Sequence, residues 1–112
     1  MHKYKELKFW QKSIDLVTTV YSLTRNFPDV EKFRLVSQIN RSAVSIPSKI
    51  VEGAGRNSDK EFVQFLAFAQ VSSYELETQL IRSNNLNHIT IDQLTELQKM
   101  NFAIQSKIKQ KA

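Results

Sequence analysis

The sequence predicts an all-α protein: an antiparallel up-down-up-down four-helix bundle that forms one domain over residues 1–112. Apolar residues recur with a spacing near 3.6 in four long segments, and no segment keeps the period of two that is typical of strands. The chain has only two glycines and two prolines, which leaves few turns. Because the connections between the four segments are short, consecutive helices are expected to be antiparallel neighbours.

Pro28 separates the first two predicted helices. The residue before a proline avoids helical geometry, so the first helix is expected at residues 7–25. Proline is favoured at the first position of a helix, so the second is expected to begin near residue 28. It should end in a glycine C-cap at Gly53 to Gly55. The two apolar stripes are Leu7, Trp10, Ile14, Val17 and Tyr21, with Leu16, Val20 and Leu23 beside them, and Val36, Ile39, Ala43, Ile46 and Ile50.

Capping boxes predict where the third and fourth helices begin. Residues 58–61 read Ser-Asp-Lys-Glu, which fits the S-x-x-E pattern, and an apolar run follows directly. The third helix is expected to continue through Leu80. Residues 83–88 form the expected loop, and a second box at residues 90–93, Thr-Ile-Asp-Gln, predicts the start of the fourth helix. This last helix should run into the lysine-rich end of the chain.

A polar face runs along the second helix. Its residues are spaced by 3, 4, 4 and 3 positions: Gln38, Arg41, Ser45, Lys49 and Glu52. Pro47 lies within this helix, where a proline costs about 3 kcal/mol and frees a backbone carbonyl. The nearby serines, Ser42, Ser45 and Ser48, are expected to bond such freed groups. Three interpretations of the polar face remain open: a structural or interfacial network, a ligand surface, and an ordinary solvated face.

Apolar residues are also expected on the outer faces of the second and third helices. These residues are Val44, Val51, Phe68 and Val71. In a monomer they would face solvent. Because they add apolar surface to most sides of these two helices, the sequence favours a homo-oligomer. The predicted subunit interface or polar network comprises Gln38, Arg41, Val44, Ser45, Val51, Glu52, Phe68 and Val71.

Positive charge is concentrated at the two ends of the chain. Residues 1–12 hold four lysines and one glutamate, a net charge of +3, and residues 99–112 hold four lysines and no acid. Residues 13–98 hold eight basic and ten acidic residues, a net charge of −2. In an up-down-up-down bundle the two chain ends and the turn between the second and third helices meet at the same end. We call the resulting set the basic pole: Lys3, Lys5, Lys8, Lys12, Lys49, Arg56, Lys60, Lys107, Lys109 and Lys111.

The basic pole predicts a nucleic-acid partner. Lysines bind backbone phosphates, and aromatic residues near them in the sequence, Tyr4, Phe9 and Trp10, could stack on bases. Trp10 also fits the apolar stripe of its helix, so a core position is the other interpretation for it. Solvated lysines that only keep the protein soluble are the alternative explanation for the charge. No zinc finger, RNP motif or KH loop is present in the sequence.

The sequence favours a protein without enzymatic activity. The chain has no cysteine, and its two histidines, His2 and His88, are too far apart in sequence for a two-histidine metal site. We therefore expect no metal and no cofactor. The spacing of Arg82 and His88 resembles the R-x(4–6)-H signature of HEPN ribonucleases, which leaves metal-free RNA cleavage as a remote alternative. A protein-interaction scaffold, for example for a polymerase, is the nearer alternative.

No apolar run approaches the length of a membrane span, so we expect a cytoplasmic protein.

Several sequence blocks resemble one known family. They are Leu-Lys-Phe-Trp-Gln-Lys at residues 7–12, Phe-Pro-Asp-Val-Glu at 27–31, Gln-Ile-Asn-Arg-Ser-Ala-Val-Ser-Ile-Pro at 38–47, Glu-Gly-Ala-Gly-Arg at 52–56, Glu-Phe-Val-Gln-Phe-Leu at 61–66 and Glu-Leu-Glu-Thr-Gln-Leu at 75–80. The chain resembles the family of the 23S rRNA intervening-sequence protein, which is related to the accessory variability determinant of diversity-generating retroelements.

The resemblance implies a four-helix bundle, commonly assembled as a homopentamer, with no known catalytic site. For the retroelement relatives it implies a basic barrel that contacts nucleic acid and a reverse transcriptase. Two positions depart from the family pattern: Lys49 stands where the family usually has asparagine, and Val71 where it usually has glycine. Lys49 adds charge to the basic pole, and Val71 adds volume at a helix face.

Overall fold

Four long helices make up the fold. The computed structural model of the chain describes residues 3–27 and 29–111. After a short 3-10 turn, η1 (Tyr4–Glu6), come four α-helices: α1 (Lys8–Thr24), α2 (Asp29–Ala54), α3 (Asp59–Arg82) and α4 (His88–Lys111). No strand occurs among these described residues. The predicted all-α four-helix bundle is therefore confirmed.

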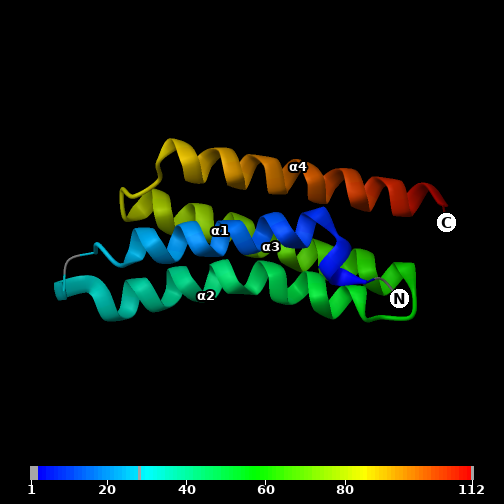
Figure 1. Cartoon of the computed structure of the whole chain (residues 1–112), viewed down its shortest axis with the longest axis horizontal. Coiled ribbons are helices and arrows are strands. Elements are labelled where there is room, and N and C mark those ends of the chain that lie inside the picture. The colour runs from blue at the N-terminus through cyan, green and yellow to red at the C-terminus, as the bar shows by residue number, and fades with distance from the viewer. Residues whose placement is uncertain (1–2, 28, 112) are drawn as a thin grey trace.

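The four helices form an elongated bundle in which consecutive helices run in opposite directions (Figure 1). α2 packs against α1 and α3, while α4 packs against α3 and α1, which closes the bundle. The principal extents are 49 × 22 × 20 Å. The N-terminal segment, the α2–α3 turn and the end of α4 lie at the same end of the bundle (Figure 1). This common end is the one that the sequence predicted as the basic pole.

Aliphatic side chains from all four helices fill the core. Leu16, Ile39, Leu66 and Leu76 are completely buried, and Leu94 is 2% exposed. Burial of one such side chain contributes roughly 1.5–3 kcal/mol to folding. Pro47, inside α2, is also buried, and the helix continues through it.

The core face of α1 differs from the predicted heptad stripe. Ile14 and Tyr21 were expected in the stripe, but they are 37% and 42% exposed. The buried residues of α1 are Phe9, Ser13, Leu16, Val20 and Thr24. Both sides of α1 carry apolar residues, so spacing alone does not identify the buried side. The position of α1 between α2 and α4 decides which side is buried.

The two predicted capping boxes have different outcomes. At the start of α3, the Glu61 amide donates to Ser58 Oγ at 3.2 Å and Ser58 Oγ donates to Glu61 Oε2 at 3.2 Å, which confirms the first box. The second box is wrong, because α4 begins at His88 and not at Thr90. Asn87 Oδ1 accepts hydrogen bonds from the Thr90 amide and from Thr90 Oγ1, both at 2.9 Å. The amide side chain of Asn87 therefore caps α4.

The predicted end of α2 between Gly53 and Gly55 is confirmed, since the helix ends at Ala54, but the end is not a left-handed glycine cap, because no glycine in the described residues has a positive φ. Gly53 lies inside the helix. A Cβ atom on Gly53 would lie 2.7 Å from Phe65 Cβ, so this glycine allows α2 and α3 to approach closely. The left-handed cap occurs instead at Asn84, which has a φ of 60° at the end of α3. There the Asn85 amide donates to the Leu80 carbonyl at 2.9 Å, as in a Schellman motif.

Candidate nucleic-acid interface

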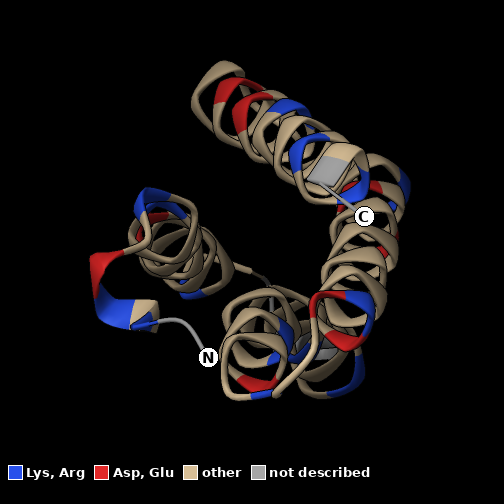
Figure 2. Cartoon of the chain, turned by 90° about the vertical axis from the view of Figure 1, so that its right-hand side faces the viewer, with Lys and Arg blue, Asp and Glu red and all other residues tan. Residues whose placement is uncertain are grey.

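The bundle brings positive charge from three separate chain segments to one end. Figure 2 looks onto this end: Lys and Arg lie on η1 and α1, around the α2–α3 turn and along α4, with acidic residues between them. Five acids lie in the same region as the ten residues of the basic pole: Glu6, Glu52, Asp59, Glu61 and Glu96, which leaves a net charge of +5. The rest of the chain holds six basic and six acidic residues, a net charge of 0. The charge of the molecule is therefore strongly one-sided.

Within the described part of the structure, three residues of the basic pole interact with other side chains. Lys12 Nζ lies 3.1 Å from Glu96 Oε1 and joins α1 to α4. Lys49 Nζ lies 3.5 Å from Glu52 Oε1, one turn further along α2. The Arg56 guanidinium lies 4.7 Å from the centre of the Phe65 ring, in a cation–π contact. Glu96 and Glu52 therefore offset the charges of Lys12 and Lys49.

Most of the other lysines of the basic pole are exposed and available. They form no ion pair with any residue that the structure describes: Lys3, Lys5, Lys8, Lys60, Lys107 and Lys109. The side chain of Lys111 lies outside the described part of the structure. These lysines come from η1, α1, α3 and α4, so they surround the end of the bundle on several sides. This arrangement is suited to contacts with several phosphate groups at once.

The aromatic residues predicted near the pole are packed within the protein. Phe9 is 3% exposed. Tyr4 and Trp10 meet edge to face, with ring centroids 5.2 Å apart, and both pack against the core. They are not free platforms for stacking. Sequence reasoning missed a different aromatic residue, Phe102 on α4, which is 72% exposed. Its position outside the apolar stripe of α4, which consists of Leu94, Leu97, Ile104 and Ile108, was the available signal.

The polar face of α2 is used partly inside the bundle. The Ser45 and Ser72 hydroxyls lie 2.8 Å apart, and Ser42 Oγ donates to Gln79 Oε1 at 3.3 Å. The expectation that Ser42 and Ser45 bond backbone groups freed by Pro47 is therefore wrong, since both bond side chains of α3. Gln38, Arg41 and Glu52 are exposed. The serines thus link α2 to α3, while the charged residues of this face point to solvent.

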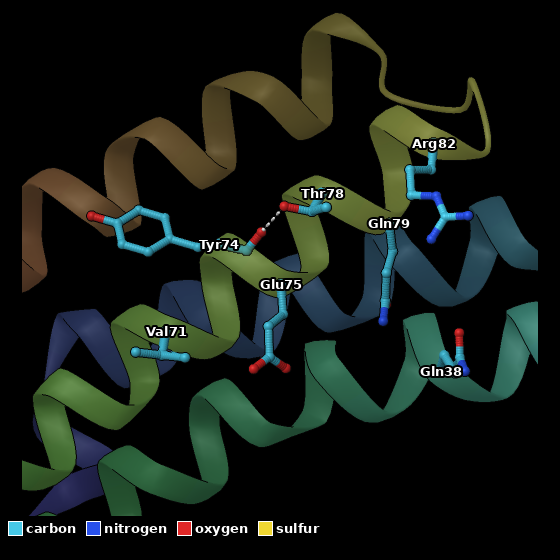
Figure 3. A pocket seen from close by; sticks show the side chains of 7 residues that line it. All are labelled: Gln38, Val71, Tyr74, Glu75, Thr78, Gln79 and Arg82. Atoms are coloured by element: carbon cyan, nitrogen blue, oxygen red, sulfur yellow. Dashed lines mark hydrogen bonds between the residues drawn. The ribbon is translucent and has the colours of Figure 1, made fainter.

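A shallow hollow lies on the outer side of α2 and α3 (Figure 3). It has a volume of about 410 Å³ and is lined by Gln38, Val71, Tyr74, Glu75, Thr78, Gln79 and Arg82. Two residues of the predicted subunit interface, Gln38 and Val71, are among them. The predicted apolar surface residues are exposed to different degrees: Val44 by 37%, Phe68 by 43% and Val71 by 52%, whereas Val51 is half-buried.

The Arg82 and His88 pair does not form a connected site. Arg82 lines the α2–α3 hollow, and His88 is an exposed residue at the start of α4. No hydrogen bond or ion pair joins them among the described residues. Within the same residues, no group of three or more His, Cys, Asp or Glu side chains could hold a metal ion.

The match to one family covers nearly the whole sequence. The family model described as 23S rRNA-intervening sequence protein matches residues 5–110, which include all of α1, α2 and α3 and α4 up to residue 110. The chain belongs to this family. A comparison of this family member with curated proteins finds no match. A search of the described helices finds none with the length and apolar character needed to cross a membrane.

Proposed function

We propose that this member of the 23S rRNA-intervening sequence protein family binds nucleic acid through its basic pole and has no catalytic role. It would act as a homo-oligomeric accessory protein associated with RNA or DNA. The observation that carries this proposal is the one-sided charge: available lysines from both ends of the chain and from α3 lie at one end of the bundle. The family description, which names a sequence within ribosomal RNA, supports RNA as the first partner to test.

Binding at such a surface is expected to depend on phosphates more than on base sequence. Lysine presents a flexible ammonium group, which contacts phosphate without the fixed two-pronged geometry that arginine uses to recognise a base edge. Each phosphate that is neutralised releases condensed counterions, so the affinity falls steeply as salt increases. The proposed interface therefore predicts strong salt dependence and low sequence specificity.

The lysines at the end of α4 provide the direct test. We expect the double variant Lys107→Gln/Lys109→Gln to bind a structured RNA hairpin and a DNA duplex more weakly than the wild type. For the duplex, the slope of log K against log salt should decrease by roughly 2 per bound protomer, because each lost phosphate contact contributes about 0.9. Fluorescence anisotropy between low and near-physiological salt measures both quantities.

A matched control removes the same charge from the opposite end of the bundle. Arg25, after α1, and Arg34, in α2, are exposed there. The double variant Arg25→Gln/Arg34→Gln should keep the wild-type slope. An unchanged slope in the Lys107→Gln/Lys109→Gln variant, or the same decrease in the control, would show that the basic pole is not the phosphate-binding surface.

The proposed self-association rests on the outer surface of α2 and α3. Val44, Phe68 and Val71 are partly exposed on these two helices, and Val71 lines the hollow of Figure 3. Burial of such side chains against a second copy would remove apolar surface from water, which is the usual driving force for a homo-oligomer. This surface lies on the sides of α2 and α3, so an interface there leaves the end of the bundle available for nucleic acid.

A further inference from the structure

Phe102 is an aromatic side chain that faces solvent on the helix that carries the last lysines. The buried residues of α4 include Leu94 and Leu97, each 2% exposed, and Asn101, which is 1% exposed. Phe102 follows directly after Asn101 but is 72% exposed. The ring does not belong to the core, and no described aromatic or cationic group packs against it. The ring is therefore available for a contact outside the described monomer.

The buried side chain of Asn101 fixes the rotation of α4 that exposes Phe102. Asn101 Nδ2 donates to the Leu66 carbonyl of α3 at 2.8 Å, and Asn101 Oδ1 accepts from Gln105 Nε2. A buried amide needs its hydrogen bonds, so α4 is held in the rotation that satisfies them. Successive helical residues are about 100° apart, which turns Phe102 away from the core when Asn101 is buried. The exposure of Phe102 thus follows from the packing of α4 on α3.

Two lysines lie on either side of Phe102 on the same face of α4. Lys99 precedes it by three residues and Lys109 follows it by seven, spacings that return to one helix face. With a rise of 1.5 Å per residue, they lie about 4.5 Å and 10.5 Å from Phe102 along the axis. Both are exposed, and α4 has no acidic residue after Glu96. The aromatic ring therefore lies between two cations along this face of α4, whereas Glu96, six residues before Phe102, lies on another face and pairs with Lys12.

We propose that Phe102 stacks on an unpaired nucleobase while Lys99 and Lys109 bind the phosphates on its two sides. This inference rests on the proposed function and names its substrate class: single-stranded or looped nucleic acid. An exposed aromatic ring with flanking cations is the arrangement that single-strand-binding proteins use, because every base presents a π face. Bases within a duplex are already stacked on each other and cannot reach the ring. The aromatic residues that the sequence placed near the pole, Tyr4, Phe9 and Trp10, are packed, whereas Phe102 is 72% exposed and has no described ring contact of the kind that joins Phe68 to Phe65.

The test compares single-stranded and duplex RNA of equal charge. The variant Phe102→Leu keeps an apolar side chain but removes the ring. We expect it to bind an unstructured 20-nucleotide RNA between about fivefold and a hundredfold more weakly than the wild type, the range measured for loss of one stacked base. A perfectly paired RNA duplex with the same number of phosphates should bind both proteins equally. The salt dependence should not change, because no charge is lost.

Two further variants serve as controls. Phe33, on α2 at the opposite end of the bundle, is 92% exposed, and Phe33→Leu should bind both RNAs as the wild type does. Phe102→Tyr retains a ring and should restore single-strand binding. Direct evidence of stacking comes from Phe102→Trp, whose fluorescence should be quenched by single-stranded RNA but not by the duplex. The same RNA should not quench Phe33→Trp beyond the background from Trp10.

The possible results separate this inference from the proposed function. If the wild type binds single-stranded RNA and Phe102→Leu binds it equally well, the stacking role of Phe102 is wrong. The proposal that the basic pole binds nucleic acid is then unaffected. An equal loss of affinity for single strand and duplex would also overturn the stacking role. A smaller oligomer in sedimentation for Phe102→Leu would assign Phe102 to a subunit interface and overturn it too. If the wild type binds neither RNA, the proposed function itself fails.

Discussion

At the scale of single residues, Gly53 shows how a missing side chain sets the distance between two helices. It lies in the last turns of α2, where the end of this helix meets the start of α3 next to the basic pole. An added Cβ would be 2.7 Å from Phe65 Cβ and 2.9 Å from the Phe62 ring. Phe65 in turn supports the guanidinium of Arg56. The spacing allowed by Gly53 therefore also positions a cation of the pole.

The variant Gly53→Ala is expected to be destabilised by roughly 1–3 kcal/mol, because the two helices must move apart to accommodate the methyl group. Unfolding in guanidinium chloride measures this loss. Gly55→Ala is the matched control: its Cβ would meet only the Val51 and Glu52 carbonyls, at 3.6 and 3.8 Å, which are ordinary contacts. It should change the stability by less than about 0.5 kcal/mol. Equal stability of Gly53→Ala and the wild type would contradict the close approach.

At the scale of elements, polar side chains determine where α4 begins and how it faces α3. Asn87 caps its first turn, and Asn101 bonds the Leu66 carbonyl. Between them, Gln98 Nε2 donates to Glu77 Oε1 at 2.9 Å. These contacts, together with the apolar packing of Leu94 and Leu97, place α4 in one rotation. The orientation of Phe102 and of the flanking lysines depends on this placement.

The cap of α4 can be tested by comparing Asn87→Ala with Asn87→Asp. Alanine removes the oxygen that accepts from the Thr90 amide, so a loss of about 1 kcal/mol is expected. Aspartate retains an accepting oxygen and adds a favourable charge at the start of the helix, so it should preserve stability. Thermal and chemical unfolding report the difference. Equal destabilisation by both substitutions would show that the side-chain oxygen of Asn87 does not stabilise α4.

At the scale of the whole molecule, the antiparallel topology brings the positive charge of the chain to one end of the bundle. The net charge of the chain is +5, and it is distributed so that one end of the bundle is strongly basic while the rest is close to neutral. Like charges at one end repel each other, and a polyanion relieves this repulsion. The exposed apolar residues of the predicted subunit interface, Val44, Phe68 and Val71, lie on α2 and α3 instead. The two proposed contacts, with nucleic acid and with further copies of the chain, therefore use different surfaces.

Self-association predicts a particle heavier than the 13.0 kDa chain in sedimentation experiments. Val71→Lys should shift it towards the monomer, because the charge would be buried in the proposed interface without a partner. Ile81→Lys is the control: Ile81 is 57% exposed on α3 but lies outside the predicted interface. It should leave the particle mass unchanged. A wild type that is monomeric at every concentration would contradict the proposed assembly.

Local patterns in the sequence determined the number and order of the helices, most of their boundaries and the cap at Ser58. They suffice for this because helical periodicity and capping depend on residues within one or two turns. The sequence also showed that lysines are concentrated at both ends of the chain. The antiparallel order of the helices then predicted that these lysines lie at the same end of the bundle. The resemblance to the 23S rRNA-intervening sequence family was also carried by short contiguous blocks.

Only the tertiary structure decided which of these side chains are available. Ile14 and Tyr21 are exposed because α2 and α4 cover another side of α1. Lys12 is paired because Glu96, 84 positions later, lies beside it. Gly53 is needed because Phe65 faces it, and Phe102 is exposed because Asn101 finds its partner on α3. Each of these outcomes depends on an atom that is distant in sequence, and packing alone brings such atoms together.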